Sequence, residues 1–343
     1  MRAVDGVSLT VAAAQTVALV GESGSGKSSI ARAVLGLTPT AGGSILFQDT
    51  DITHFTNRQR RTLHASMQAV FQDPYASLNP ARTIGKSLVE TLRPQRVDSD
   101  VARSRATAML ERVGLPRSAI DRYPAQFSGG QRQRIAIARA LMTQARLVIC
   151  DEPVSALDLS VQAQILNILR DLQDTLGVSY LFISHDLPVV RHIAHRTVVL
   201  YRGQVMEAGP TRAVHDSPAH PYTRLLLDSV PAPDGARRRS VSAARLSAQP
   251  SGAPAARPST GCPFAGRCLY AVSVCAVERP AIEITPDGAA VACHRWRELP
   301  GRTPTRVGEP LGTVTGPYPA GQPPISAVGS HTVVDEPPSP SSS

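Results

Sequence analysis

The chain has 343 residues, 42% of them hydrophobic, which is enough for one large domain with a buried core and a smaller one beside it. No apolar run approaches the ~18 residues of a membrane-spanning helix, and no export signal is visible, so membrane-spanning and exported proteins are not expected. The net charge is +9, but it comes from dispersed arginines, and we expect no nucleic acid as partner. Five cysteines in such a chain do not predict a disulfide framework.

Short apolar runs alternate with helical patterns in the first two thirds of the chain, which predicts an α/β fold around a mainly parallel sheet. Between about residues 73 and 135 the pattern is helical without strong strands, as in an inserted helical subdomain. The predicted strands are 16–20, 147–150, 179–184 and 197–201, and the predicted helices are 28–37, 131–141 and 160–176.

Proline divides the chain. Of the 29 prolines, 8 lie before residue 210 and 21 lie from Pro210 onward, which predicts a compact first part and a loop-rich last part. We therefore expect a main domain at 1–210, a C-terminal extension at 211–300 with a linker at 231–260, and a disordered tail at 301–343 without assigned function.

A glycine-rich loop follows the first predicted strand and opens a helix, which is the pattern of a phosphate-binding loop. Its backbone N–H groups and the helix N-terminus would face phosphate, Lys27 would reach the β- and γ-phosphates, and Ser28 would join a Mg²⁺ shell. This motif predicts a P-loop NTPase core. The predicted nucleotide-binding residues are Gly21, Glu22, Ser23, Gly24, Ser25, Gly26, Lys27, Ser28 and Ser29.

Two adjacent carboxylates, Asp151 and Glu152, end the apolar run 147–150. In open α/β folds, ligands bind at the carboxyl ends of the strands, so both side chains are expected at the nucleotide. Asp151 is suited to the outer coordination shell of Mg²⁺, and Glu152 is suited to polarise the attacking water.

A second anion-binding helix start is predicted at Ser128-Gly129-Gly130-Gln131, before the helix that ends at residue 141. With this motif the chain resembles the ATP-binding subunits of ABC transporters, over residues 1 to about 300. The resemblance implies that the Ser-Gly-Gly of one subunit completes the nucleotide site of its partner in a head-to-tail dimer.

The resemblance also implies roles for three further residues. Gln72, in the run 70–74, matches the glutamine that senses Mg²⁺ and the attacking water, in a loop that touches the membrane subunits. Asp158 matches the loop that crosses the dimer interface, and His185 matches the switch histidine on the γ-phosphate. Because all catalytic positions match, we expect a hydrolysing subunit.

The aromatic residue that stacks on adenine in this family is missing, since no aromatic residue precedes Phe47, and we expect the true start to lie further upstream.

Two motifs narrow the family. His220-Pro221-Tyr222-Thr223 and the run 71–80 (FQDPYASLNP) are similar to oligopeptide and dipeptide importers and their nickel-transporting relatives. The resemblance implies a second ATPase subunit, either a sibling or a second copy, two membrane permeases, an extracellular solute-binding protein, and a place at the cytoplasmic face of the membrane. Nickel or another solute remains an alternative as the transported substrate.

A non-transport ABC ATPase is a weaker alternative, because only one phosphate loop and no long coiled coil occur. A purely regulatory ATP switch is disfavoured by the Asp151–Glu152 pair.

Four thiols lie within about thirty residues of the extension, at Cys262, Cys268, Cys275 and Cys293. Such a group favours metal ligation over disulfides. Zinc prefers paired thiols two residues apart, which are missing, whereas iron–sulfur clusters tolerate wider spacing. We therefore rank a [4Fe–4S] cluster first, zinc second and free thiols third. Cys150 is expected to be a buried hydrophobic residue.

Overall fold

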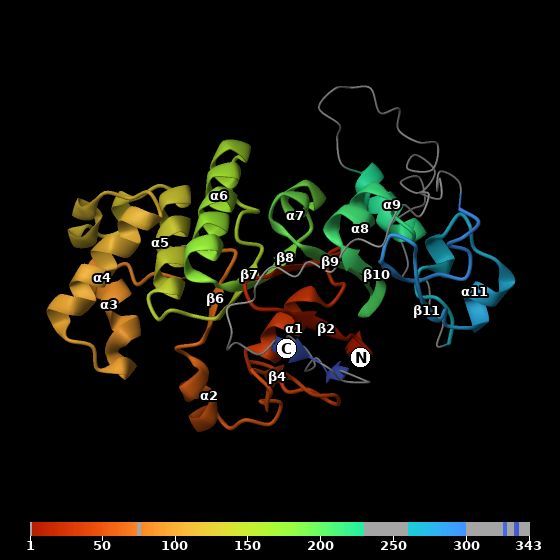
Figure 1. Cartoon of the computed structure of the whole chain (residues 1–343), viewed down its shortest axis with the longest axis horizontal. Coiled ribbons are helices and arrows are strands. Elements are labelled where there is room, and N and C mark those ends of the chain that lie inside the picture. The colour runs from red at the N-terminus through yellow and green to blue at the C-terminus, as the bar shows by residue number, and fades with distance from the viewer. Residues whose placement is uncertain (1, 74–76, 230–259, 300–324, 328–332, 336–343) are drawn as a thin grey trace, which may run out of the picture.

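The structure, a computed structural model, describes residues 2–73, 77–229, 260–299, 325–327 and 333–335. Its centre is a sheet of eight strands in the order β11-β12-β10-β9-β3-β8-β7-β6 (Figure 1). Five neighbouring strands are parallel, which confirms the α/β class with a mainly parallel core. They are β3 (Thr16–Val20), β6 (Met67–Val70), β7 (Leu147–Asp151), β8 (Ser179–Ser184) and β9 (Arg196–Tyr201).

The central strands are buried on both faces, which explains why they are continuous apolar runs rather than alternating ones. β3 and β8 have the predicted bounds, and β7 and β9 differ from prediction by one residue at one end. β6 was not predicted, because its short run carries Gln68 and shows no clear pattern.

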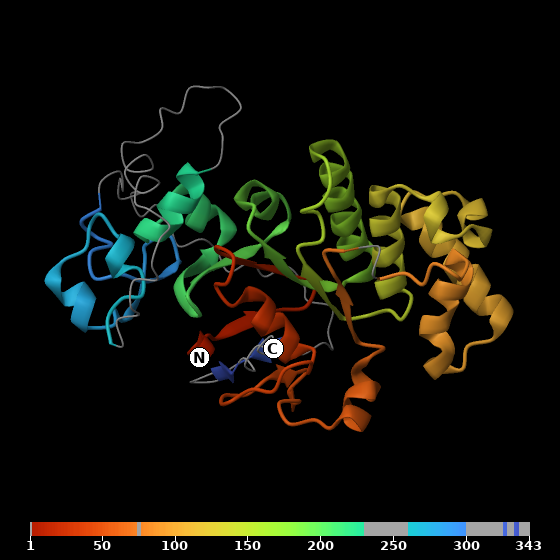
Figure 2. The same cartoon turned by 180° about the vertical axis from the view of Figure 1, so that it is seen from behind.

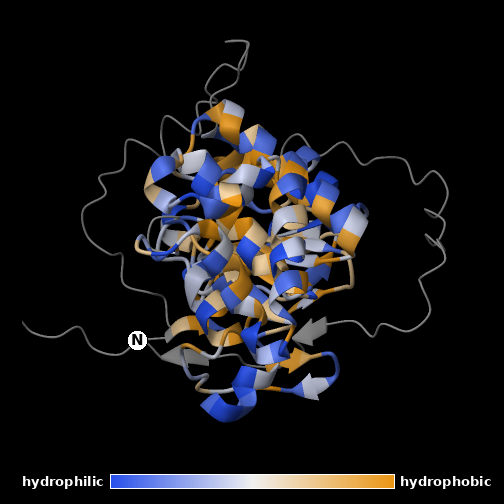
Figure 3. Ribbon diagram, turned by 90° about the vertical axis from the view of Figure 1, so that its left-hand side faces the viewer, coloured by the Kyte–Doolittle hydropathy of each residue, from blue (hydrophilic) through white to orange (hydrophobic). Residues whose placement is uncertain are grey.

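Helices cover both faces of this sheet (Figures 1 and 2). One face carries α1 (Lys27–Val34) together with β1 (Arg2–Asp5), β2 (Leu9–Val11), β4 (Leu46–Phe47), β5 (Thr50–Asp51) and α2 (Asn57–Leu63). The other carries α5 (Gly129–Leu141), α6 (Leu159–Leu176), α7 (Leu187–Ile193), α8 (Thr211–Asp216) and α9 (Pro221–Asp228). Apolar residues concentrate between the layers (Figure 3), and burying them is the main source of stability.

The inserted helical subdomain is present beyond β6. It contains α3 (Ile84–Val89), α4 (Ser99–Arg112) and short 3₁₀ turns. Leu88 and Leu110 are fully buried in it and belong to one apolar cluster with Ile135 of α5 and Val148 of β7. The subdomain therefore shares its core with the sheet, through α5.

The C-terminal extension continues the central sheet. In the second described stretch of the extension, 260–299, α11 (Ser273–Val277) is followed by β11 (Ile282–Ile284) and β12 (Ala290–Ala292), and β12 pairs with β10 (Gln204–Pro210) of the main domain. Buried Glu207 of β10 accepts hydrogen bonds from the N–H groups of Ala219 and His220, which holds the entry to α9 on the sheet. The boundary predicted near residue 210 therefore crosses a shared sheet and a shared hydrogen-bond network.

Most of the expected tail, 301–343, and of the linker, 231–260, lies outside the described residues. Two short strands of the tail are described: β13 (Ile325–Ala327) pairs with β2, and β14 (Val333–Asp335) pairs with β1. The low apolar content of the tail did not predict them. Across the described ranges we find no helix that combines the length and the hydropathy needed to cross a membrane.

Candidate nucleotide-binding site

The phosphate-binding loop joins β3 to α1 and curls tightly against its surroundings. Gly26 has φ +101°, and a Cβ atom there would lie 2.7 Å from the carbonyl oxygen of Ala3. A Cβ atom on Gly21 would lie 2.2 Å from the carbonyl oxygen of Leu200, so both positions require glycine. Ser23 and Gly24 are exposed at the open side, Ser25 is buried, and Ser28 and Ser29 are half-buried in the first turn of α1.

Lys27 is buried and closes the loop on itself. Its Nζ donates hydrogen bonds to the carbonyl oxygens of Gly21, at 2.8 Å, and Glu22, at 2.9 Å. Burial lowers the pKa of Lys27, and the carboxylates of Glu152, Asp151 and Glu22 oppose that shift. The ammonium group therefore lies among carbonyl oxygens that a phosphate can replace.

Ser28 and Asp151 meet across the site. The Ser28 hydroxyl donates to Oδ1 of Asp151 at 3.2 Å. Burial raises the pKa of Asp151, and the Ser28 hydrogen bond and nearby Lys27 and Arg32 work against this rise. Oxygen donors of this kind fit Mg²⁺, so the pair is suited to hold the ion that accompanies a nucleoside triphosphate.

Glu152 and His185 form a second pair beside the loop. Nδ1 of His185 lies 3.2 Å from Oε1 of Glu152, because β7 and β8 are adjacent and both residues follow their carboxyl ends. Glu152 has φ +49°, a left-handed backbone that is uncommon for a residue with a side chain. Its N–H donates to the Ile183 carbonyl, which fixes this turn. Strained backbone of this kind is typical of functional positions.

Gln72 lies two residues beyond β6, in an exposed loop at the same edge of the sheet as the ends of β7 and β8. The structure therefore brings Lys27, Ser28, Asp151, Glu152 and His185 together and places Gln72 at their side.

The Ser-Gly-Gly motif lies elsewhere, on the helical side of the molecule. Ser128 is the N-cap of α5: its hydroxyl accepts from the N–H of Gln131, and Oε1 of Gln131 accepts from the N–H of Ser128. Gly130 packs so closely on Val161 that a Cβ atom would lie 2.5 Å from its Cγ1. Asp158 caps α6 next to this contact, through hydrogen bonds from Ser160 and Val161 that lower its pKa. Ser128 and Asp158 are exposed, so both are available to a partner.

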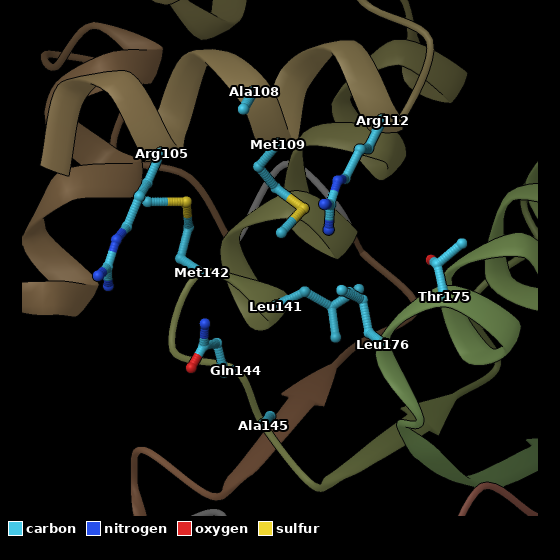
Figure 4. A pocket seen from close by; sticks show the side chains of 10 residues that line it. All are labelled: Arg105, Ala108, Met109, Arg112, Leu141, Met142, Gln144, Ala145, Thr175 and Leu176. Atoms are coloured by element: carbon cyan, nitrogen blue, oxygen red, sulfur yellow. The ribbon is translucent and has the colours of Figure 1, made fainter. Parts of the chain in front are cut away.

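Among the described residues, two cavities that border the helical subdomain are distinct from the nucleotide site. The first, of about 460 Å³, lies between α4, the C-terminal end of α5 and the end of α6 (Figure 4). It includes Ala145, which precedes β7, so it lies at the edge of the sheet opposite the nucleotide residues. The second, of about 560 Å³, lies between α2, β6 and the turn that follows α3, and includes Phe71 beside Gln72.

Sequence reasoning missed three residues at the loop. Both terminal nitrogens of the Arg267 guanidinium donate to the Glu22 carboxylate, at 2.8 and 3.0 Å, and these hydrogen bonds are the main cause that raises the pKa of Arg267. The Tyr222 hydroxyl accepts from the Glu22 N–H at 2.9 Å, and Tyr201 packs against Tyr222. Tyr222 was noticed only as part of a family motif. No spacing rule connects Glu22 to a residue 245 positions later.

The four cysteines of the extension are neighbours. Burial raises the pKa of Cys268 and of Cys293 to about 11 each, and nearby Cys262 and Cys275 add to both shifts. However, throughout the part of the chain that the structure describes, no group of three or more His, Cys, Asp or Glu side chains is arranged to hold a metal ion. Thiolates are ligands of iron–sulfur clusters and of zinc, but the described residues do not show a preformed site for either, so both stay predictions. Protonated thiols would have to lose their protons first.

Comparisons with known proteins agree with this geometry. Residues 4–155 match the family model "ABC transporter", and residues 206–275 match "Oligopeptide/dipeptide transporter, C-terminal region". The peptide ABC transporter ATP-binding protein y4tS of Sinorhizobium fredii is 46% identical over 86% of this chain and 82% of its own. A protein of Brucella ovis named for peptide import and ATP binding is 45% identical over 86% of this chain and 92% of its own.

Solved structures give the same result. CbiO1 of Clostridium perfringens, part of an ABC transporter complex, has a TM-score of 0.59 at 26% identity, over 63% of this chain and 84% of that one. The dimeric ATP-binding cassette MJ0796 has a TM-score of 0.56 at 27% identity, over 61% of this chain and 91% of that one. With its phosphate loop, its Asp-Glu pair and these relatives, the chain belongs to the ATP-binding ATPases of the ABC transporter family, in the group that carries the oligopeptide/dipeptide transporter C-terminal region.

Proposed function

We propose that this chain hydrolyses ATP to drive the import of di- and oligopeptides through a membrane complex. The single observation that carries the proposal is the convergence of Lys27, Ser28, Asp151, Glu152 and His185 on one edge of the sheet. The match of residues 206–275 to the oligopeptide/dipeptide transporter C-terminal region supports the substrate class.

The reaction is an in-line attack of water on the γ-phosphate. Lys27 exchanges its loop carbonyls for phosphate oxygens and offsets their charge. Glu152 accepts the proton of the attacking water, and His185, which already contacts Glu152, orients that carboxylate and the γ-phosphate. Ser28, Asp151 and Gln72 would hold Mg²⁺, which supplies charge neutralisation to the triphosphate.

The site needs a second ATPase subunit. Ser128 and the following glycines start α5, whereas the phosphate loop starts α1 on the other face of the sheet (Figure 1). The exposed Ser128 and Asp158 then close over the ATP of a partner, and the partner's motif closes over the ATP of this chain. The dimeric form of the related cassette supports this arrangement, with either a sibling or a second copy as partner.

A permease docks in the groove beside Gln72. This cavity of about 560 Å³ lies between the core and the helical subdomain and includes the exposed apolar side chains of Leu37 and Phe71. A short permease helix bound in the groove would contact the Gln72 loop, so a movement of this loop would displace the helix. The chain would thus attach peripherally at the cytoplasmic face of the membrane, while an extracellular solute-binding protein selects the cargo.

An uptake experiment tests the substrate class. The chain is reconstituted in liposomes with the proposed partners, a second ATPase subunit and two permeases from the same organism, and a solute-binding protein is added. We expect ATP-dependent accumulation of labelled tri-alanine and stimulation of ATP hydrolysis by that peptide. Uptake of Ni²⁺ without peptide uptake would favour the nickel-importer alternative, and hydrolysis that no transport component changes would favour a non-transport ABC ATPase.

We also propose that Cys262, Cys268, Cys275 and Cys293 hold a [4Fe–4S] cluster, with zinc as second choice. The proximity of the four thiols supports this: Cys262 and Cys275 add to the raised pKa values of Cys268 and Cys293, and the N–H of Cys262 donates to the carbonyl oxygen of Cys275. Protein purified without oxygen from iron-replete cells should absorb visible light and contain iron and sulfide in equal amounts. Cys268→Ser should abolish this absorbance, and Cys150→Ala, at the buried thiol of β7, should preserve it. Zinc in the metal analysis would replace iron in the proposal, and metal-free protein would refute it.

A further inference from the structure

The C-terminal extension holds the phosphate-binding loop at Glu22 in two ways. The Glu22 carboxylate accepts two hydrogen bonds from the Arg267 guanidinium, at 2.8 and 3.0 Å. The Glu22 main-chain N–H donates to the Tyr222 hydroxyl at 2.9 Å. A two-point contact of this kind fixes both the side chain and the backbone of the second residue of the loop.

Arg267 is itself held in place by aromatic rings. Its guanidinium carbon lies 5.8 Å from the ring centroids of both Tyr201 and Phe264, and the two rings pack edge to face, 5.3 Å apart. Tyr222 completes the group, 4.7 Å from Tyr201 and 5.2 Å from Phe264. Since Tyr201 ends β9 of the main domain and Phe264 belongs to the extension, the rings join the two parts around this arginine.

The charge of Glu22 is unfavourable in a loop that receives a triphosphate. An unpaired carboxylate there would repel the phosphates, whereas Arg267 neutralises it. The negative charge of Glu22 acts on Lys27, the residue expected to contact the β- and γ-phosphates, because it opposes the lowering of the Lys27 pKa by burial. The ion pair is about one third exposed on each side, at 35% and 40%, so solvent screens it only in part.

We propose that Arg267 is a positioning residue of the nucleotide site: it neutralises Glu22 and, with Tyr222, fixes the loop, so that the C-terminal extension sets the affinity for ATP. The turn that carries Arg267, 265–267, lies between Cys262 and Cys268. Any rearrangement of the four-cysteine segment would therefore move Arg267 and change nucleotide affinity. This inference rests on the proposed binding of ATP phosphates in the loop.

A double-mutant cycle on the full chain tests this role of Arg267. The measurement is the dissociation constant of a fluorescent ATP analogue in the presence of Mg²⁺. Arg267→Gln leaves the Glu22 carboxylate unpaired and should weaken binding about five- to tenfold. Glu22→Gln leaves a free guanidinium near the phosphates and should tighten binding about two- to fivefold. The double variant, which carries neither charge, should return to within about twofold of the unmodified protein, and all differences should shrink in 1 M salt.

Arg297→Gln is the matched control. Arg297 lies in the same extension, stacks over Trp296 and pairs with Glu283 of β11, but β11 is four strands away from β3. It should leave nucleotide affinity unchanged, and in steady-state hydrolysis Arg267→Gln should raise KM with little change in kcat.

Three outcomes are decisive. An Arg267→Gln protein that binds as tightly as the control overturns the inference. So does a double variant that stays as weak as Arg267→Gln, because the loss would then be one of packing and not of charge. Failure of the unmodified protein to bind nucleotide would instead refute the proposed function.

Discussion

Glu152→Gln is expected to lower kcat for ATP hydrolysis by about 100- to 10 000-fold, the range that a positioned general base contributes. The amide has nearly the shape of the carboxylate and can keep the contact with His185, so the left-handed turn at Glu152 should persist. ATP affinity should remain, because Lys27, Ser28 and Asp151 are untouched. Phosphate release measures the first effect, and binding of a fluorescent ATP analogue measures the second.

The same variant should accumulate as an ATP-bound dimer, because hydrolysis is the step that reopens it. Light scattering after size-exclusion chromatography, with the partner ATPase present and absent, would detect this. Glu278→Gln, an exposed carboxylate of the extension, provides the control and should hydrolyse ATP normally. Turnover of Glu152→Gln at the rate of this control would remove Glu152 from the mechanism.

Ser128→Arg is expected to abolish hydrolysis without preventing ATP from binding to the separate subunit. Ser128 lies at the start of α5, and its hydroxyl and its main-chain N–H form hydrogen bonds with Gln131 of its own capping box, so its proposed role is in the partner's site. The large cation would block the closing surface, and the loss of a preorganised donor to the γ-phosphate costs about 100- to 1000-fold in rate. We expect no ATP-dependent dimer when Ser128→Arg is combined with Glu152→Gln.

Ser128→Thr separates helix capping from the role in the partner's site. Threonine preserves the hydroxyl that accepts from Gln131, so both variants can be compared for thermal stability. Loss of the cap alone costs about 1 kcal/mol in the free energy of unfolding and cannot explain a loss of dimerisation. A Ser128→Arg subunit that still dimerises and hydrolyses ATP would contradict the proposed head-to-tail site.

The residues of the nucleotide site could be predicted because their chemistry is local. A buried strand, a glycine-rich turn and a helix start form one continuous segment around Lys27, and the Asp151–Glu152 pair likewise ends a strand. The parallel sheet then brings these segments to one edge, by a rule that holds for all open α/β folds. His185 was harder to place, and the family resemblance rather than its own surroundings identified it.

The cysteines show where spacing was insufficient. Four thiols within a short segment predict a common ligand, and the fold does bring them close together, yet it leaves no metal-holding group among the described residues. Sequence spacing limits how far apart ligands can lie, but ligand geometry depends on backbone turns such as 265–267 and on burial, which composition does not determine.

The sequence by itself determined the type of ATPase domain, because phosphate binding relies on short segments whose backbone conformation their own residues dictate. Only the tertiary structure decided how the C-terminal extension joins that domain. It paired β12 of the extension with β10 of the main domain, and it placed Arg267 on Glu22 through rings from two parts of the chain. These contacts depend on how separate elements pack, and no local preference of either segment encodes which distant partner it will meet.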